Sequence, residues 1–160
     1  MTLNDLVNNP QPDLRPQFKK FSAAVGKTDS LTTSIRDADA NLQARSAVYF
    51  DNWDKELATI QNEDIRASGQ ARKLEVLTQC NSVRNACLTT QTECTPLLSD
   101  LDDVHRFLNS DLTAAGLTAI KEATARVNRT AAPVQDSVNK LVADMRALST
   151  AMSPQVVTEK

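Results

Sequence analysis

Apolar residues recur every seven positions over most of the chain, and this repeat is the feature that most limits what it can fold into. In the middle of the chain, one series is Cys80, Cys87, Cys94, Leu101 and Leu108, and its companion is Val76, Val83, Thr90, Leu97 and Val104. A heptad pattern sustained in this way is typical of helices that pack side by side at shallow angles. The sequence therefore predicts long, packed helices.

The same spacing occurs on both sides of this region. Toward the C-terminus the two series are Ile120, Val127, Val134, Leu141 and Leu148, with Thr124, Ala131, Val138, Met145 and Met152. Toward the N-terminus they are Phe21, Thr28, Ile35, Leu42 and Tyr49, with Val25, Thr32, Ser46, Trp53 and Ile60. Polar residues stand at several expected core positions, namely Thr28, Thr32, Ser46, Glu56 and Thr90. They indicate either a weak core or a face that is buried only when a partner arrives.

Capping residues divide the pattern into three parts. Asp13 can cap a first helix, Asn62 a second, and the stretch Asn109 to Asp111 a third. The sequence predicts an all-α fold, an elongated antiparallel three-helix bundle or coiled coil with up-down-up topology. Its helices are expected over about 14–61, 63–109 and 111–152. Residues 14–152 then form the bundle, residues 1–13 an N-terminal extension or linker, and residues 153–160 a disordered tail.

Composition excludes several classes of function. Lys and Arg number 18 against 20 Asp and Glu, so no basic field exists to attract nucleic acid. Three glycines and one histidine leave no phosphate-binding glycine loop and no multi-histidine metal site. No apolar run is long enough to span a membrane. Met1 to Pro16 lacks the features of a signal peptide, so an exported form is expected to be the mature chain with a start Met.

The three cysteines are candidates for chemistry. Cys80, Cys87 and Cys94 stand two helical turns apart, too far for a disulfide between neighbours. As a functional site, the three thiols would bind soft metal ions along the helix or act as a redox switch. As core residues, they would pack as small apolar side chains. We expect packing, because the row continues as Leu101 and Leu108.

Two further patterns resemble known sites. Asp102 and His105 have the spacing of half a di-metal carboxylate-histidine site, but one histidine is too few, so a solvated helix face is expected. Asn128-Arg129-Thr130 matches a glycosylation acceptor that is common by chance and here lies mid-helix. The sequence predicts no catalytic residues, no cofactor and no metal.

Pro96 and Pro133 fall inside predicted helices and are expected to bend them. Reflection about the second turn places Pro96 opposite about Arg126. A tolerated kink is the favoured interpretation. The alternative is a hinge or an exposed carbonyl site, with a ligand pocket between the helices.

Half of the six aromatic residues lie between Tyr49 and Trp53. Reflection about the turns predicts a layer of Trp53, Leu74, Met145 and Leu148 that closes one end of the bundle. Phe18, Phe21 and Phe107 are expected near the other end. Phe50 lies off the heptad positions and is the one possible contact with a protein partner.

Four segments of the chain resemble the sequences of a bacterial family of unknown function, number 2959. They run over Tyr49–Leu57, Asn62–Ser68, Thr95–Leu101 and Phe107–Thr113, within a resemblance from about Phe18 to Met152. The family usually begins with a further helical stretch, where this chain has Met1 to Pro16. The resemblance implies an elongated helical protein of the bacterial envelope or periplasm, and it implies no activity.

We therefore expect a non-enzymatic structural or protein-interaction module of the bacterial cell envelope. It is expected to act by presenting long helix faces, with a protein partner or self-association possible. The alternatives are a ligand-sensing bundle with a pocket near Pro96 and Pro133, and a cytoplasmic rather than a periplasmic location.

Overall fold

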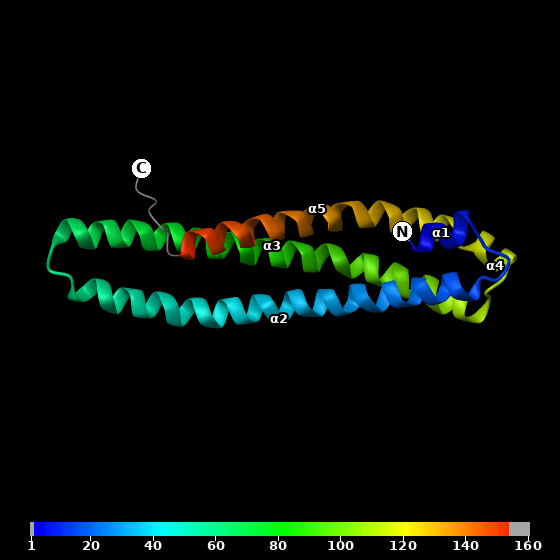
Figure 1. Cartoon of the computed structure of the whole chain (residues 1–160), viewed down its shortest axis with the longest axis horizontal. Helices are drawn as coiled ribbons and strands as arrows, with labels where there is room; N and C mark the ends of the chain where they lie inside the picture. Colours follow the sequence, from blue (N-terminus) through cyan, green and yellow to red (C-terminus); the bar gives the residue numbers. More distant parts are fainter. Residues whose placement is uncertain (1, 154–160) are drawn as a thin grey trace, which may run out of the picture. The chain divides into compact units, whose positions relative to one another are not determined.

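A computed structural model describes residues 2–153 and contains five helices in that range. They are α1 (Thr2–Asn8), α2 (Arg15–Thr59), α3 (Glu63–Ser110), α4 (Ala114–Ala119) and α5 (Lys121–Met152), and no strand occurs among the described residues (Figure 1). The chain divides into two compact units. Unit 1 comprises residues 1–35 and 90–136, and unit 2 comprises residues 36–89 and 137–160. The predicted all-α fold of long packed helices is confirmed.

The first two long helices begin and end close to the predicted positions. The Asp13 carboxylate accepts a hydrogen bond from the backbone N–H of Arg15 (3.1 Å), just before α2 begins. The Asn62 side chain accepts one from the backbone N–H of Ile65 (3.1 Å) at the start of α3. These bonds satisfy N–H groups that the first turn of a helix leaves without intrahelical partners.

The third predicted helix, over 111–152, is interrupted. α4 begins after Thr113, whose hydroxyl accepts a hydrogen bond from the backbone N–H of Gly116 (3.1 Å). α4 then stops at Ile120, where φ is −92° and ψ is 4°, and α5 starts at the next residue. Ile120 and Leu117 are both buried, so the break keeps both side chains in the core of unit 1.

The segment expected to be an N-terminal extension contains α1. Leu3, Leu6 and Val7 lie on one face of this helix and are at most 7% exposed. The Asn4 and Asn128 side chains donate to each other's amide oxygens, at 3.1 and 2.9 Å, and so hold α1 against α5. A helix this short is not stable alone, so its packing against α4 and α5 within unit 1 is what forms it. Residues 154–160 of the predicted tail lie outside the described residues.

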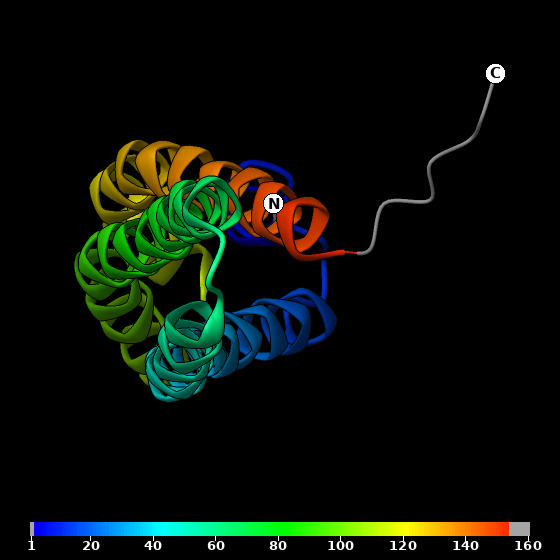
Figure 2. The ribbon, with the colours of Figure 1, turned by 90° about the vertical axis from the view of Figure 1, so that its left-hand side faces the viewer.

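The heptad series predicted for α3 and α5 form most of the cores. In α3, nine of the ten predicted positions are buried and Leu101 is half-buried. Of the C-terminal series, the one from Ile120, which directly precedes α5, to Leu148 is buried throughout, whereas Met145 and Met152 of its companion are exposed. In the end-on view of Figure 2, α3 lies beside both α2 and α5.

The buried positions of α2 shift partway along the helix. Val25, Thr32 and Asp39 are buried seven residues apart, and the next buried residues are Phe50 and Leu57. The step from Asp39 to Phe50 spans eleven residues, or about three helical turns. It is one heptad lengthened by four residues, so the seven-residue spacing of the buried positions is interrupted there. The predicted core role of Glu56 is wrong, since its side chain is exposed.

Candidate functional site

The three cysteines are core residues of the bundle. Cys80, Cys87 and Cys94 are free thiols that are 7%, 4% and 3% exposed. Burial, and secondarily the negative charge of Asp39, raise the pKa of the Cys87 thiol above its ordinary value. A thiol held in its neutral form is a poor nucleophile and a poor metal ligand. The predicted packing role is therefore what their burial supports.

Asp39 is a buried polar group that the sequence analysis did not single out. Its residue is 7% exposed, and its Oδ2 atom accepts a hydrogen bond from Gln43 Nε2 (3.1 Å). Its Oδ1 atom is buried without a hydrogen-bond partner among the described residues. Burying a carboxylate oxygen without a hydrogen-bond partner is unfavourable, so Asp39 lowers the stability of unit 2.

His105 forms a small polar and aromatic cluster in unit 1. Its Nε2 atom lies 3.0 Å from the hydroxyl oxygen of Ser22. Its ring stacks on Phe18, with centroids 5.3 Å apart, and lies 6.3 Å from the ring of Phe21. Of the aromatic residues expected at this end, Phe18 and Phe21 are in the cluster, whereas Phe107 is 40% exposed.

The hydrogen bonds of Ser22 decide what this cluster can do. The Ser22 hydroxyl donates to the backbone carbonyl of Phe18 at 3.0 Å. Because a hydroxyl has one hydrogen, Ser22 Oγ must accept from His105 Nε2. A catalytic serine needs the opposite arrangement, with the histidine taking the hydroxyl proton. The pair therefore has the geometry of a structural contact. Asp102, the other half of the carboxylate-histidine spacing, is exposed, as expected for a solvated helix face.

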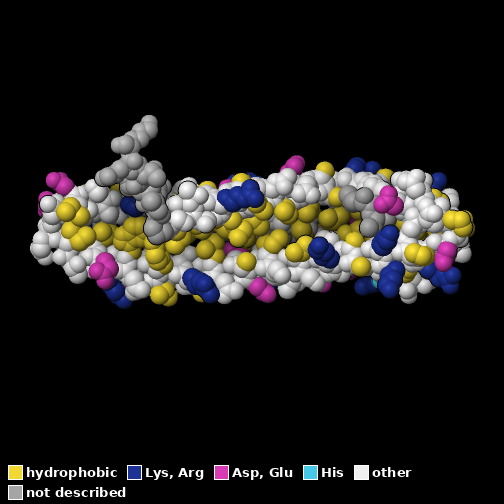
Figure 3. Space-filling view, viewed as in Figure 1, with side chains coloured by type: hydrophobic (Ala, Val, Ile, Leu, Met, Phe, Trp, Pro, Cys, Tyr) yellow, Lys and Arg dark blue, Asp and Glu magenta, His cyan; other side chains and the backbone are white. Residues whose placement is uncertain are grey.

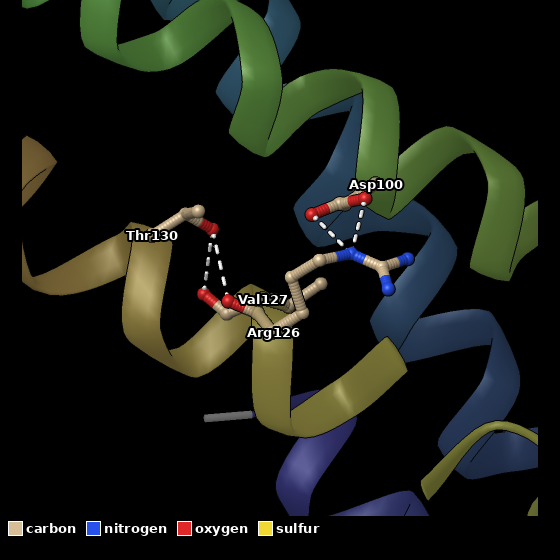
Figure 4. Close-up of polar contacts among 4 residues, drawn as sticks. All are labelled: Asp100, Arg126, Val127 and Thr130. Carbon is tan, nitrogen blue, oxygen red and sulfur yellow. Dashed lines mark hydrogen bonds and ion pairs between the residues drawn. The ribbon is translucent and has the colours of Figure 1, made fainter. Parts of the chain in front are cut away.

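The second turn brings α3 and α5 together close to the predicted alignment. Figure 4 shows Arg126 of α5 pointing toward Asp100 on α3, where its Nε atom lies 2.9 and 3.1 Å from the two carboxylate oxygens. The sequence predicted Pro96 opposite Arg126, and the observed partner, Asp100, lies one helical turn after Pro96. Pro96 and Pro133 lie inside α3 and α5, and both helices continue past them. The bend expected at each proline stays a prediction.

Asn128, the first residue of the possible glycosylation acceptor, forms two hydrogen bonds with Asn4 through its side-chain amide and is only partly exposed. Its neighbour Thr130 donates its hydroxyl to the carbonyl oxygens of Arg126 (3.2 Å) and Val127 (3.1 Å), as Figure 4 also shows. A glycosylation acceptor lies on an exposed loop. The placement of this tripeptide inside α5 therefore favours a chance match.

The aromatic group of unit 2 differs from the prediction. Phe50, expected to be exposed, is 8% exposed, and its ring stacks on Trp53 with centroids 6.3 Å apart. Tyr49, expected in the core, is 41% exposed. The eleven-residue step in α2 turns Phe50 inward and Tyr49 outward. The exposure on which the Phe50 partner contact rested is wrong, and the contact itself stays a prediction.

The closed layer predicted at the end of unit 2 is also wrong. Leu148 is buried, but Leu74 and Met145 are 61% and 50% exposed. Leu74 and Met145 lie at the predicted level along their helices, but no neighbouring side chains cover them. The layer is therefore open.

Neither Pro96 nor Pro133 lines the cavities found between residues 5–20 and 112–121 or between residues 42–46 and 77–84. In unit 1, a cavity of about 820 Å³ lies between the segment joining α1 to α2 and the start of α4. Val7, Leu14 and Leu117 form part of its lining, and Arg15 and Lys121 bring positive charge to it. Arg15 is paired with Asp13, and that hydrogen-bonded pair lowers the pKa of the Asp13 carboxyl. In unit 2, a cavity of about 210 Å³ lies between α2 and α3 beside Cys80 and Arg84.

Among residues 2–153, no three histidine, cysteine or acidic side chains are grouped so that they could hold a metal ion. None of the helices described is both long and apolar enough to cross a membrane.

Comparison with known proteins gives one match. A family described as "Protein of unknown function (DUF2959)" matches residues 1–157. The match includes the N-terminal residues, so the predicted departure from the family over Met1 to Pro16 is wrong, and α1 is a helical stretch at that place. No match was found among the curated proteins or the solved structures. Because the family model covers nearly the whole chain, this protein belongs to the family of unknown function DUF2959.

Proposed function

We propose that this protein is a non-enzymatic helical module of the bacterial cell envelope that binds a protein partner through an exposed helix face. One observation carries the proposal. Of ten large hydrophobic residues that are exposed among those described, eight belong to unit 2 and only Leu31 and Phe107 to unit 1. Exposed apolar side chains that gather on one part of a protein are typical of interaction surfaces.

The polar groups support a role without catalysis. The Ser22 proton is bonded to a backbone carbonyl, and the pKa of the Cys87 thiol is raised. Neither side chain is activated as a nucleophile in this arrangement. The proposed location in the envelope or periplasm depends on the family resemblance alone.

Fractionation of the native host and light scattering together test the proposal. The chain is expected in the periplasmic or membrane-associated fraction, and in a complex larger than its own 17.5 kDa after size exclusion. Recovery from the cytosol argues against the location. A strict monomer that binds nothing from an envelope extract argues against the interaction.

The cavity in unit 1 favours a second candidate, a bundle that senses a small ligand. Its volume of about 820 Å³ lies in the range of small-molecule sites, and its lining combines apolar side chains with Lys121 and the Asp13–Arg15 ion pair. An apolar anion matches that combination. Titration with medium-chain fatty acids tests this candidate: saturable binding that weakens in Lys121→Glu supports it, and no heat or shift in Tm argues against it.

A further inference from the structure

Unit 2 leaves helix-packing positions uncovered. Met145 and Met152 of α5 stand at heptad positions, yet they are 50% and 46% exposed, and Tyr49 of α2, next to the buried Phe50, is 41% exposed. Val142, one turn before Met145, is 40% exposed. Heptad positions are the ones that a neighbouring helix covers. We call these four residues the open seam.

The two helices that carry the open seam are aligned by α3. Lys73 of α3 forms an ion pair with Asp54 of α2, and its neighbour Arg72 donates to the backbone carbonyl of Ala151 on α5. Asp54 and Ala151 therefore lie at one level. Tyr49 precedes Asp54 by five residues and Met145 precedes Ala151 by six, on helices that both run antiparallel to α3.

Since each residue advances a helix by about 1.5 Å, Tyr49 and Met145 lie at nearly the same level. Within unit 2, α3 lies beside both α2 and α5, in agreement with its contacts to Asp54 and Ala151 (Figure 2). Figure 3 shows hydrophobic side chains gathered between α2 and α5 on the face toward the viewer. The open seam therefore belongs to the two helices, α2 and α5, that flank these hydrophobic side chains.

Unit 1 shows what kind of element covers such positions. There α1 buries Leu3, Leu6 and Val7 and contacts α4, as a short additional helix beside the long ones. Its side chains repeat at the spacing of one helix face. By the same packing rule, the open seam of unit 2 fits a helix face of matching spacing.

We infer that the open seam of one copy packs against the open seam of a second copy of this chain. Charge permits this pairing, because residues 36–89 and 137–160 contain ten basic and ten acidic side chains. Two copies of unit 2 therefore meet without net repulsion. A patch that is apolar, roughly neutral and presented identically by both partners suits a two-fold interface.

The size of the face is sufficient for a specific dimer. From Leu42 to Thr59, α2 runs for about 26 Å, and two neighbouring helices are about 22 Å across. The product is about 600 Å² per copy, or about 1,200 Å² in the pair, which lies at the lower end of specific interfaces. The dimer is therefore expected to be weak and to depend on protein concentration. This inference rests on the proposed function and names its partner.

Sedimentation of the full-length chain tests the pairing in solution. The weight-average mass is expected to rise from 17.5 kDa toward twice that value as concentration increases. Met145→Glu places a charge in the middle of the face and is expected to weaken dimerisation at least tenfold. Val48→Glu is the matched control, because Val48 is 61% exposed on α2 and is not a heptad position. It is expected to leave dimerisation unchanged.

Met152→Glu is a second variant on the face, and circular dichroism verifies that each variant remains helical. A wild-type chain that stays monomeric up to about 1 mM overturns the inference. Equal weakening by Val48→Glu and Met145→Glu also overturns it, because the effect is then not specific to the open seam.

A photo-crosslinking residue at position 145 of the full-length chain, used in living cells, separates this inference from the proposed function. An adduct of two copies supports both. An adduct with a different protein overturns the second copy as partner and leaves the proposed interaction function standing. Absence of any adduct, with the same residue at position 48 as background, counts against both.

Discussion

His105 on α3 holds Ser22 on α2, with its Nε2 atom 3.0 Å from the serine hydroxyl oxygen. The contact joins two residues that are far apart in the sequence and links the only histidine of the chain to a helix that carries Phe18 and Phe21. Because the Ser22 proton is donated to the Phe18 carbonyl, the contact fixes the imidazole rather than activating the serine. Its contribution is therefore expected in stability.

Ser22→Ala is expected to lower the free energy of unfolding by about 1 kcal/mol, since it leaves His105 Nε2 without its partner. Urea denaturation measures the change. A fluorophosphonate probe, which labels activated serines, is expected to leave the wild-type protein unlabelled. Labelling of the wild type that disappears in Ser22→Ala would show that the hydroxyl proton is available to the histidine after all.

Two glycines are expected to respond in opposite directions to a methyl group. A Cβ at Gly116 would lie 2.2 Å from the backbone carbonyl oxygen of Asp111, whereas a Cβ at Gly26 would meet nothing within 4 Å. Gly116→Ala must therefore displace the backbone and is expected to destabilise unit 1 by about 2 kcal/mol or more. Gly26→Ala, inside α2, is expected to stabilise the protein by about 1 kcal/mol.

Thermal or urea unfolding of both glycine variants measures the difference. Stabilisation by Gly116→Ala would mean that the tight turn from Asp111 into α4 relaxes without cost. A loss of stability in Gly26→Ala would place an unexpected neighbour against that side of α2.

The sequence predicted contacts between α2 and α3 better than it predicted exposure. Reflection about the first turn placed Trp53 opposite Leu74, and the observed Asp54–Lys73 ion pair lies one residue away on both helices. The same reflection places Ser22 opposite His105, so the signal for that contact was present. The alignment is predictable because a short turn between two straight helices fixes which residues face each other.

Exposure was harder to predict, because it depends on how many helices surround a position. Met145 and Met152 carry the correct heptad spacing, yet a pattern on one helix does not report whether a neighbouring helix covers it. Phe50 was predicted to be exposed because the sequence pattern did not reveal the eleven-residue step that interrupts the seven-residue spacing in α2. α1 was missed because three apolar residues in a short stretch form a helix only when another surface receives them.

The reciprocal amide pair predicts coupled losses. Asn4→Ala and Asn128→Ala are each expected to cost about 1 kcal/mol, because each leaves a partly buried amide unpaired. In the double variant both amides are absent, so its loss is expected to be well below the sum of the single losses. Hydrogen exchange of the α1 amides measures the effect directly. Strictly additive losses would show that the two side chains do not interact.

The buried thiol of Cys87 predicts a pH dependence. The fold raises the pKa of this thiol through burial and, to a lesser extent, through the charge of Asp39. The folded state therefore favours the neutral thiol, whereas the unfolded chain ionises at the ordinary value of about 8.5. The stabilising contribution is complete below that pH and is lost as pH rises toward the folded pKa.

Urea unfolding between pH 7 and pH 10 measures this loss. The decline above pH 8.5 is expected to be smaller in Cys87→Ala than in the wild type, because that titrating group is gone. Asp39→Asn removes the nearby charge and is expected to give an intermediate decline. It also replaces a carboxylate whose Oδ1 atom has no partner among the described residues, so it is expected to stabilise the protein at neutral pH by about 1 kcal/mol. Identical declines in all three proteins would show that Cys87 ionises as freely in the fold as in the unfolded chain.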